Sequence, residues 1–277
     1  MDDITQKQRH HHDVLLALLN YDHFQALELE LKQLAFDGKD EILLLVQLAN
    51  AILQVDIENV KKLAQNTPFQ GVLDASQLER KAYYYLQTLT LQLKRQEYGD
   101  YLRGLTPLLV DVFRIAIERD FLPNLAEYIQ PIKKETTNGA HLYRGLQWSQ
   151  NKIESHPNII ADTWKKYYGN YFNYDHYVSS SHLMKLIEAN SSNERLIELT
   201  STMRKIEKYL RNLVAHEVLT VNQQFFVDRI QRTPVQVHQV LLDLYDEVGL
   251  THPLQRTIIE QIKQQITLLL QQTKEKN

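Results

Sequence analysis

Apolar residues recur at spacings of three and four along almost the whole chain, and few residues interrupt that pattern. The spacing is clear from about residue 12 to 19 and again from 24 to 34. It corresponds to one face of an α-helix. The 277 residues include 8 glycines and 7 prolines, and we find no alternating β-branched run long enough to indicate a sheet. The sequence therefore predicts an all-α protein.

Glycine, proline and capping residues divide this pattern into separate helices. We expect further helices at about 39–53, 56–65, 75–97, 100–119, 122–134, 140–155, 158–168, 182–189, 194–221, 222–231, 234–248 and 254–272. Residues 21–27 and 55–61 resemble each other weakly at a spacing of 34, which indicates packed helical hairpins. We place a domain boundary at about residue 150, between a helical domain of about six helices (1–150) and a second helical bundle (151–277).

Composition and charge exclude several classes of protein. The absence of cysteine rules out disulfides and cysteine-ligated zinc. The longest apolar run, residues 42–46, is too short to span a bilayer, and the first 13 residues lack the apolar core of a signal peptide. We therefore expect a soluble, cytoplasmic protein with no membrane partner. Because the net charge is −3, any RNA contact must come from a local basic patch.

The helix expected over 194–221 has two chemically different faces. At about 100° per residue, one side collects the apolar residues Leu199, Met203, Ile206, Leu210, Leu213 and Val214. The residues that face away from it are Arg204, Lys208, Arg211, Asn212 and His216. Lys208, Asn212 and His216 follow one another at steps of four, which predicts a single polar stripe. The polar face is the candidate site.

These residue types suit RNA cleavage by the substrate's own 2′-hydroxyl. An imidazole such as that of His216 transfers protons near neutral pH, because its unperturbed pKa is about 6.5. The planar guanidinium of Arg211 suits phosphate oxygens and the charge of a phosphorane. Asn212 can orient either group, and Arg204 and Lys208 can guide the RNA backbone. The chemistry requires no cofactor and no metal, and the sequence has no HExxH motif or convincing carboxylate cluster.

The segment Arg211-Asn212-Leu213-Val214-Ala215-His216 resembles the R-x(4–6)-H motif of HEPN ribonucleases. The flanking text, SSSHLMKLIEAN and RKIEKYLRNLVAHEVL, is similar to the ancillary ribonucleases of type III-A CRISPR systems. The resemblance implies an HEPN-like domain over 151–277, with Arg211, Asn212 and His216 as catalytic residues. It also implies a homodimer that cuts single-stranded RNA at a composite site, as part of antiviral defence.

That family is activated by cyclic oligoadenylate bound to an N-terminal CARF domain. A CARF domain needs a Rossmann-like βαβ array, and residues 1–150 carry neither the strands nor the glycine-rich turns of one. Cyclic oligoadenylate activation is therefore in question for this chain.

Two other functions fit the same residues. The first is a catalytically inactive HEPN or helical module that binds protein partners. The second is an HEPN toxin silenced by an antitoxin. The tyrosine-rich segment 167–177 fits base stacking, although helix packing is the commoner use of such aromatics. We expect His182, Trp148 and Trp164 to be structural.

Overall fold

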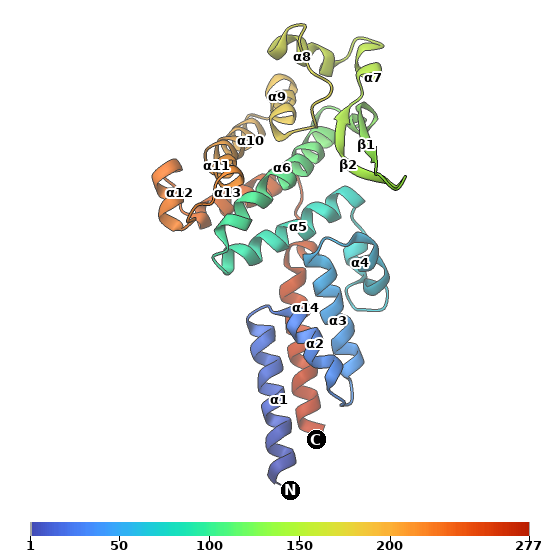
Figure 1. Cartoon of the computed structure of the whole chain (residues 1–277), viewed down its shortest axis with the longest axis vertical. Helices are drawn as coiled ribbons and strands as arrows, with labels where there is room; N and C mark the ends of the chain where they lie inside the picture. Colours follow the sequence, from blue (N-terminus) through green and yellow to red (C-terminus); the bar gives the residue numbers. More distant parts are fainter. Residues whose placement is uncertain (1, 277) are drawn as a thin grey trace. The chain divides into compact units, whose positions relative to one another are not determined.

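The computed structural model describes residues 2–276, except for the side chains of residues 2–9, 216 and 274–276 (Figure 1). Its helices are α1 (Asp2–Asn20), α2 (Phe24–Gln33), α3 (Lys39–Leu53), α4 (Ile57–Ala64), α5 (Gln77–Lys94), α6 (Tyr98–Asp120), α7 (Gln150–Glu154), α8 (Ile159–Tyr168), α9 (Ser180–Asn190), α10 (Glu194–Ile206), α11 (Asn212–His216), α12 (Gln223–Ile230), α13 (Pro234–Glu247) and α14 (Pro253–Lys276). Its strands are β1 (Ile129–Glu135) and β2 (His141–Trp148). The all-α prediction is confirmed, with the addition of one small sheet. None of the helices described is both long and apolar enough to cross a membrane.

Contacts divide the chain into two compact units. The terminal unit combines the residues before Arg95 with those from Thr251 onward, and the central unit is Arg95–Leu250. The names refer to position in the sequence. These units are defined by contacts between residues. They do not test the division into family domains at 1–150 and 151–277, which stays a prediction.

The terminal unit is a set of helical hairpins completed by the last helix. Helix α3 packs against α2 and α4, and α14 packs against α1, α3 and α5. Leu27, Val46 and Ile262 are fully buried in this unit. Burial of such an apolar face is the main source of helix stability in a folded protein.

The first two hairpins share one type of turn. The amide of His23 donates to the carbonyl of Leu18, and that of Asp56 donates to Ala51, both at 2.9 Å. In each turn the preceding residue has a positive φ, 59° at Asp22 and 56° at Val55, which ends a helix in a left-handed conformation. The weak sequence resemblance between residues 21–27 and 55–61 therefore corresponds to a repeated turn. Equivalent residues of the two turns are 33 positions apart, rather than the predicted 34.

Asp22 also holds the terminal unit together through its side chain. Its carboxylate is almost fully buried, accepts a hydrogen bond from Lys94 at 2.7 Å and forms an ion pair with Lys263. Burial tends to raise the pKa of Asp22, but hydrogen bonds from Lys263 and Lys94 outweigh it, so that the pKa lies below its ordinary value. One carboxylate thus connects the α1–α2 turn with α5 and α14.

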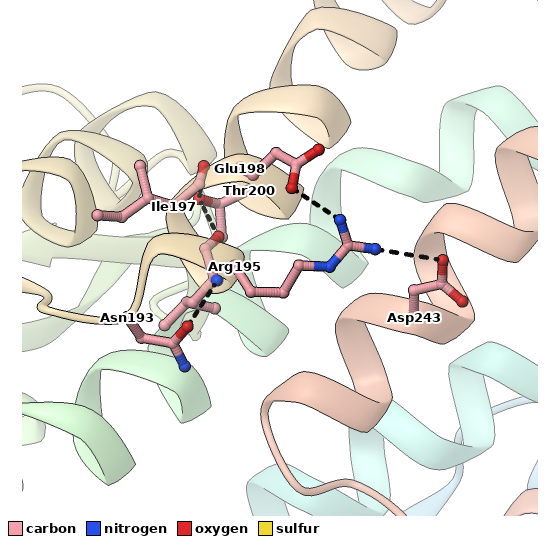
Figure 2. A network of polar contacts seen from close by, with 7 residues as sticks. Asn193, Arg195, Ile197, Glu198, Thr200 and Asp243 are labelled. Atoms are coloured by element: carbon pink, nitrogen blue, oxygen red, sulfur yellow. Dashed lines mark hydrogen bonds and ion pairs between the residues drawn. The ribbon is translucent and has the colours of Figure 1, made fainter.

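The central unit is built around two long helices. Helix α6 packs against α9 and α11, and α10 packs against α9 and α13. Figure 2 shows polar contacts of α10, in which Arg195 reaches Glu198 at 2.7 Å and Asp243 of α13 at 3.9 Å. The side chain of Asn193 caps the same helix by accepting from the amide of Leu196 at 3.0 Å.

Residues 129–148 form an antiparallel β-hairpin, so the helices predicted at 122–134 and 140–155 are wrong over most of their length. Asn138-Gly139 is the turn of this hairpin and not a helix boundary. Gly139 has a φ of 78°, and the amide of Thr136 donates to the carbonyl of Ala140 at 2.8 Å. An Asn-Gly pair is itself a strong hairpin signal.

The hairpin is attached to the rest of the central unit along β2. The amide of Val178 donates to the carbonyl of Leu146 at 2.8 Å, and Tyr177 lies against Gly145. A Cβ atom on Gly145, whose φ is +146°, would lie 2.9 Å from the Tyr177 ring. Glycine is therefore required at this close approach.

Candidate active site

The segment that carries the predicted catalytic residues is not a regular α-helix. Helix α10 is followed by a π turn over Glu207–Arg211, and only then by α11. The amide of Asn212 donates to the carbonyl of Glu207, five residues earlier. The prediction of one helix over 194–221 is therefore wrong in two respects, because a π turn interrupts the helix and the helix ends at His216. Single π turns inside α-helices are frequent at functional sites.

The π turn changes which polar residues stack. The predicted stripe of Lys208, Asn212 and His216 assumes uniform α-helical winding. A π turn contains about one more residue than an α turn. Lys208 and Asn212 therefore do not lie directly above one another.

The apolar face of the segment is placed as predicted. The residues of α10, the π turn and α11 that are buried on this face are Leu199, Met203, Ile206, Leu210 and Val214. Leu213 is half-buried. Because the apolar face is held in the core, the π turn has a fixed orientation within the central unit.

Two of the three predicted catalytic side chains are described. Arg211 ends the π turn and is half-buried, and Asn212 begins α11 and is exposed. The Nε atom of Arg211 is buried, and no described residue accepts a hydrogen bond from it. The backbone of His216 ends α11, and its side chain lies outside the described part of the structure. The catalytic assignment of these three residues therefore stays a prediction.

The buried carboxylate of Glu207 is the feature that sequence reasoning missed. Its Oε1 accepts from Thr106 Oγ1 at 2.6 Å, and its Oε2 accepts from Ser180 Oγ at 2.6 Å and from Arg204 Nη1 at 3.0 Å. The residue is 3% exposed. One sequence signal was available, because Glu207 lies four residues after Met203 and three before Leu210, in line with the apolar face.

The two residues predicted to contact RNA are in different environments. The guanidinium of Arg204 is paired with Glu207, and its side chain is about one quarter exposed, at 24%. Lys208 is exposed, and its Nζ lies 5.6 Å from the ring centre of Tyr209, which is itself exposed. Lys208 is thus better placed to meet a phosphate.

A cluster of aromatic rings surrounds His182 at the start of α9. Trp148 Nε1 donates to His182 Nδ1 at 3.2 Å, and Trp164 stacks on Phe172 with ring centres 4.5 Å apart. Burial lowers the pKa of His182 to about 4, and nearby positive charge, that of Lys185 first, adds to the effect. His182 is therefore a neutral hydrogen-bond acceptor near pH 7. The predicted structural roles of His182, Trp148 and Trp164 agree with their burial.

A second histidine of the central unit is also buried. His238 is buried beside Tyr101, with 3.3 Å between its Nδ1 and the hydroxyl, and burial lowers the pKa of His238 to about 4. Across the described residues, no three His, Asp or Glu side chains are grouped so that they could hold a metal ion. In the tyrosine-rich segment, Tyr171 is exposed, and base stacking there stays a prediction.

The central unit is mainly α-helical, with Arg211 and Asn212 at the junction of the π turn and α11 and His216 at the end of α11. The model of the Cas_Csm6 HEPN domain matches residues 71–267. The chain belongs to this family, and the resemblance to HEPN ribonucleases is confirmed at that level.

A solved structure has the same fold. It is that of Enterococcus italicus Csm6 bound to cyclic hexa-2′-fluoro-hexa-dAMP, with a TM-score of 0.67 and 11% sequence identity. The match covers 97% of this chain and 59% of that one, so this chain spans about three-fifths of its length. A search of curated proteins gives no match.

Proposed function

We propose that this chain is a metal-independent endoribonuclease that cuts single-stranded RNA in CRISPR type III antiviral defence. The observation that carries the proposal is the family match over residues 71–267, which includes the whole segment from Arg204 to His216. The proposed enzyme is cytoplasmic and homodimeric, with Arg211, Asn212 and His216 of two subunits forming a composite site.

The proposed reaction is transfer of the phosphodiester within the substrate. The 2′-oxygen attacks phosphorus, its proton passes to a base, and the bond from phosphorus to the 5′-oxygen breaks as that oxygen takes up a proton. His216 transfers protons, and Arg211 balances the charge of the phosphorane. Asn212, exposed beside Arg211, orients the phosphate. The products are a 2′,3′-cyclic phosphate and a 5′-hydroxyl end.

The surroundings of the predicted RNA contacts favour one of them. Arg204 is engaged by a buried carboxylate, whereas Lys208 is exposed next to the π turn. We therefore propose Lys208 as the residue that guides the RNA backbone. A single exposed lysine adds a modest, salt-dependent contribution to binding.

We do not propose that residues 1–150 bind cyclic oligoadenylate as an activator. The strands described in this range are those of one antiparallel hairpin, β1 and β2. A Rossmann-like array requires parallel strands joined through helices. The ligand in the solved Csm6 structure belongs to that protein.

The test uses the purified full chain, labelled single-stranded RNA and excess EDTA. Arg211→Ala and His216→Ala are each expected to lower the cleavage rate by at least about 100-fold, the usual effect of losing a charge-stabilising or proton-transferring group. The matched controls are Arg232→Ala and His141→Ala, both exposed in the central unit, which should cleave at the wild-type rate. Cleavage that requires added metal, or equal rates in all four variants, would contradict the mechanism.

The same assay separates the two alternatives. A folded wild-type protein that never cleaves RNA would favour an interaction module. Growth arrest on expression, relieved by a neighbouring gene product, would favour a toxin.

A further inference from the structure

Glu207 joins three helices of the central unit at one point. Its carboxylate accepts from Thr106 of α6, Ser180 of α9 and Arg204 of α10. Two of these donors are distant in sequence, 101 and 27 residues away. A charged carboxylate is unfavourable in the interior unless donors surround it, and here three do so.

The backbone of the same residue begins the irregular segment. The carbonyl of Glu207 accepts the amide of Asn212, which is the hydrogen bond of the π turn. Arg211 and Asn212 are the last residue of that turn and the first residue after it. The side chain that fixes the position of Glu207 therefore also fixes the start of the turn that presents these two residues.

We propose that Glu207 is a positioning residue, which holds the π turn so that Arg211 and Asn212 are presented at the active site. The inference rests on the proposed ribonuclease function. At 3% exposure Glu207 does not meet RNA itself, so it acts through the backbone. A catalytic group displaced by about 1 Å can cost about 100-fold in rate.

A residue that only stabilises the core would behave differently. Its loss would lower the melting temperature and loosen the central unit evenly. The loss of a positioning residue loosens residues 207–216 selectively and lowers kcat more than it raises KM. These two readouts separate the roles.

The experiment compares Glu207→Gln with Glu198→Gln in the full-length protein. Glu198 is an exposed residue of α10, and its variant is the matched control. Hydrogen–deuterium exchange is followed in peptides covering 207–216 and in peptides of α13, beside kcat and KM. For Glu207→Gln we expect exchange in 207–216 to rise about tenfold with α13 unchanged, and kcat to fall at least about tenfold with KM within about twofold. Glu198→Gln should match the wild type.

A milder pair keeps the inference testable where Glu207→Gln does not fold. Thr106→Val removes one donor while keeping the side-chain shape, and Thr106→Ser restores the hydroxyl. The valine variant should show the same local exchange and a smaller fall in kcat, and the serine variant should restore both. Uniform loosening of the central unit, or unchanged exchange in 207–216, would overturn the proposal. Exchange is measurable even where the wild type cleaves no RNA, and that outcome would overturn only the proposed function.

Discussion

Asp22 in the terminal unit and Glu207 in the central unit are both carboxylates with less than 5% exposure, at 4% and 3%. Their partners differ. Asp22 is paired with Lys94 and Lys263, which are 72 and 241 residues away in the sequence. Glu207 has one cation three residues away, and its other two donors are the hydroxyls of Thr106 and Ser180.

The difference separates two uses of a buried charge. Asp22 lies in a turn between regular helices and connects the beginning of the chain with its last helix. Asp22 therefore contributes to the stability of the terminal unit. Glu207 lies at the start of a π turn, next to the predicted catalytic residues, and its effect belongs to local geometry. Variants of the first should change stability, and variants of the second should change activity.

The largest expected effect on stability is that of Asp22→Asn. Asparagine tolerates the positive φ of this position, so the substitution removes mainly the charge and leaves Lys263, whose side chain is 13% exposed, without its counterion. We expect the free energy of unfolding to fall by about 3–4 kcal/mol. Denaturant unfolding measures it.

The control for this variant is Asp13→Asn, since Asp13 is an exposed aspartate of the same unit. Its effect should stay within about 0.5 kcal/mol. The value of kcat per folded molecule should be the same in both. A loss below about 1 kcal/mol for Asp22→Asn would mean that the two ion pairs contribute no more than surface pairs do.

The helices of the terminal unit could be predicted because their signals are local. Helix α3 begins after Gly38, which has a φ of 81°, and it buries Ile42, Leu45 and Val46 on one face. The prediction of 39–53 matches Lys39–Leu53. In such an array, propensity, periodicity and turn chemistry favour the same boundaries.

The hairpin could not be predicted from periodicity, because its strands have little regular burial. In β1 only the first and fourth residues are partly covered, and in β2 the last residue alone is buried. The hairpin is attached through the contact of Tyr177 with Gly145 and the hydrogen bond from Val178 to Leu146, between residues distant in sequence. The helix pattern that we inferred at 122–134 had no competing alternation to exclude it.

The candidate site also has one part that could be predicted from the sequence and one part that could not. Arg211, Asn212 and His216 are found from a local motif. The π turn and the role of Glu207 depend on Thr106 and Ser180, which only the fold brings to that position. A buried glutamate on an apolar face is a visible signal, but its partners are not.

A change of pH should affect the two units in different ranges. Burial lowers the pKa of His182 and His238 to about 4, so the unfolded chain takes up protons below about pH 6.5 while the folded chain does not. Their stabilising effect is fully present above that pH and is lost as the pH falls toward 4. Between pH 7 and pH 5 each histidine should reduce stability by roughly 2 kcal/mol.

The contribution of Asp22 lies in a lower range. Its pKa is lowered from 3.8, so its stabilising effect is present above pH 3.8 and is lost below it. Hydrogen exchange at pH 7 and pH 5, corrected for intrinsic rates, should therefore show loosening in the central unit and none in the terminal unit. His238→Gln should remove about half of this dependence. Equal loosening of both units would contradict the assignment.

The smallest expected effect is that of Arg195→Ala, in the network of Figure 2. Arg195 is a cation between two carboxylates, Glu198 and Asp243, and so reverses the arrangement at Asp22 with its two lysines. The arginine side chain is half exposed, and water weakens the attraction that burial preserves at Asp22. We expect a loss of less than about 1 kcal/mol, and less still at high salt. Arg195→Lys, which keeps the charge, should lie closer to the wild type in the same denaturation series. A loss as large as that of Asp22→Asn would show that the number of ion pairs, and not their burial, sets the contribution of each carboxylate–cation cluster.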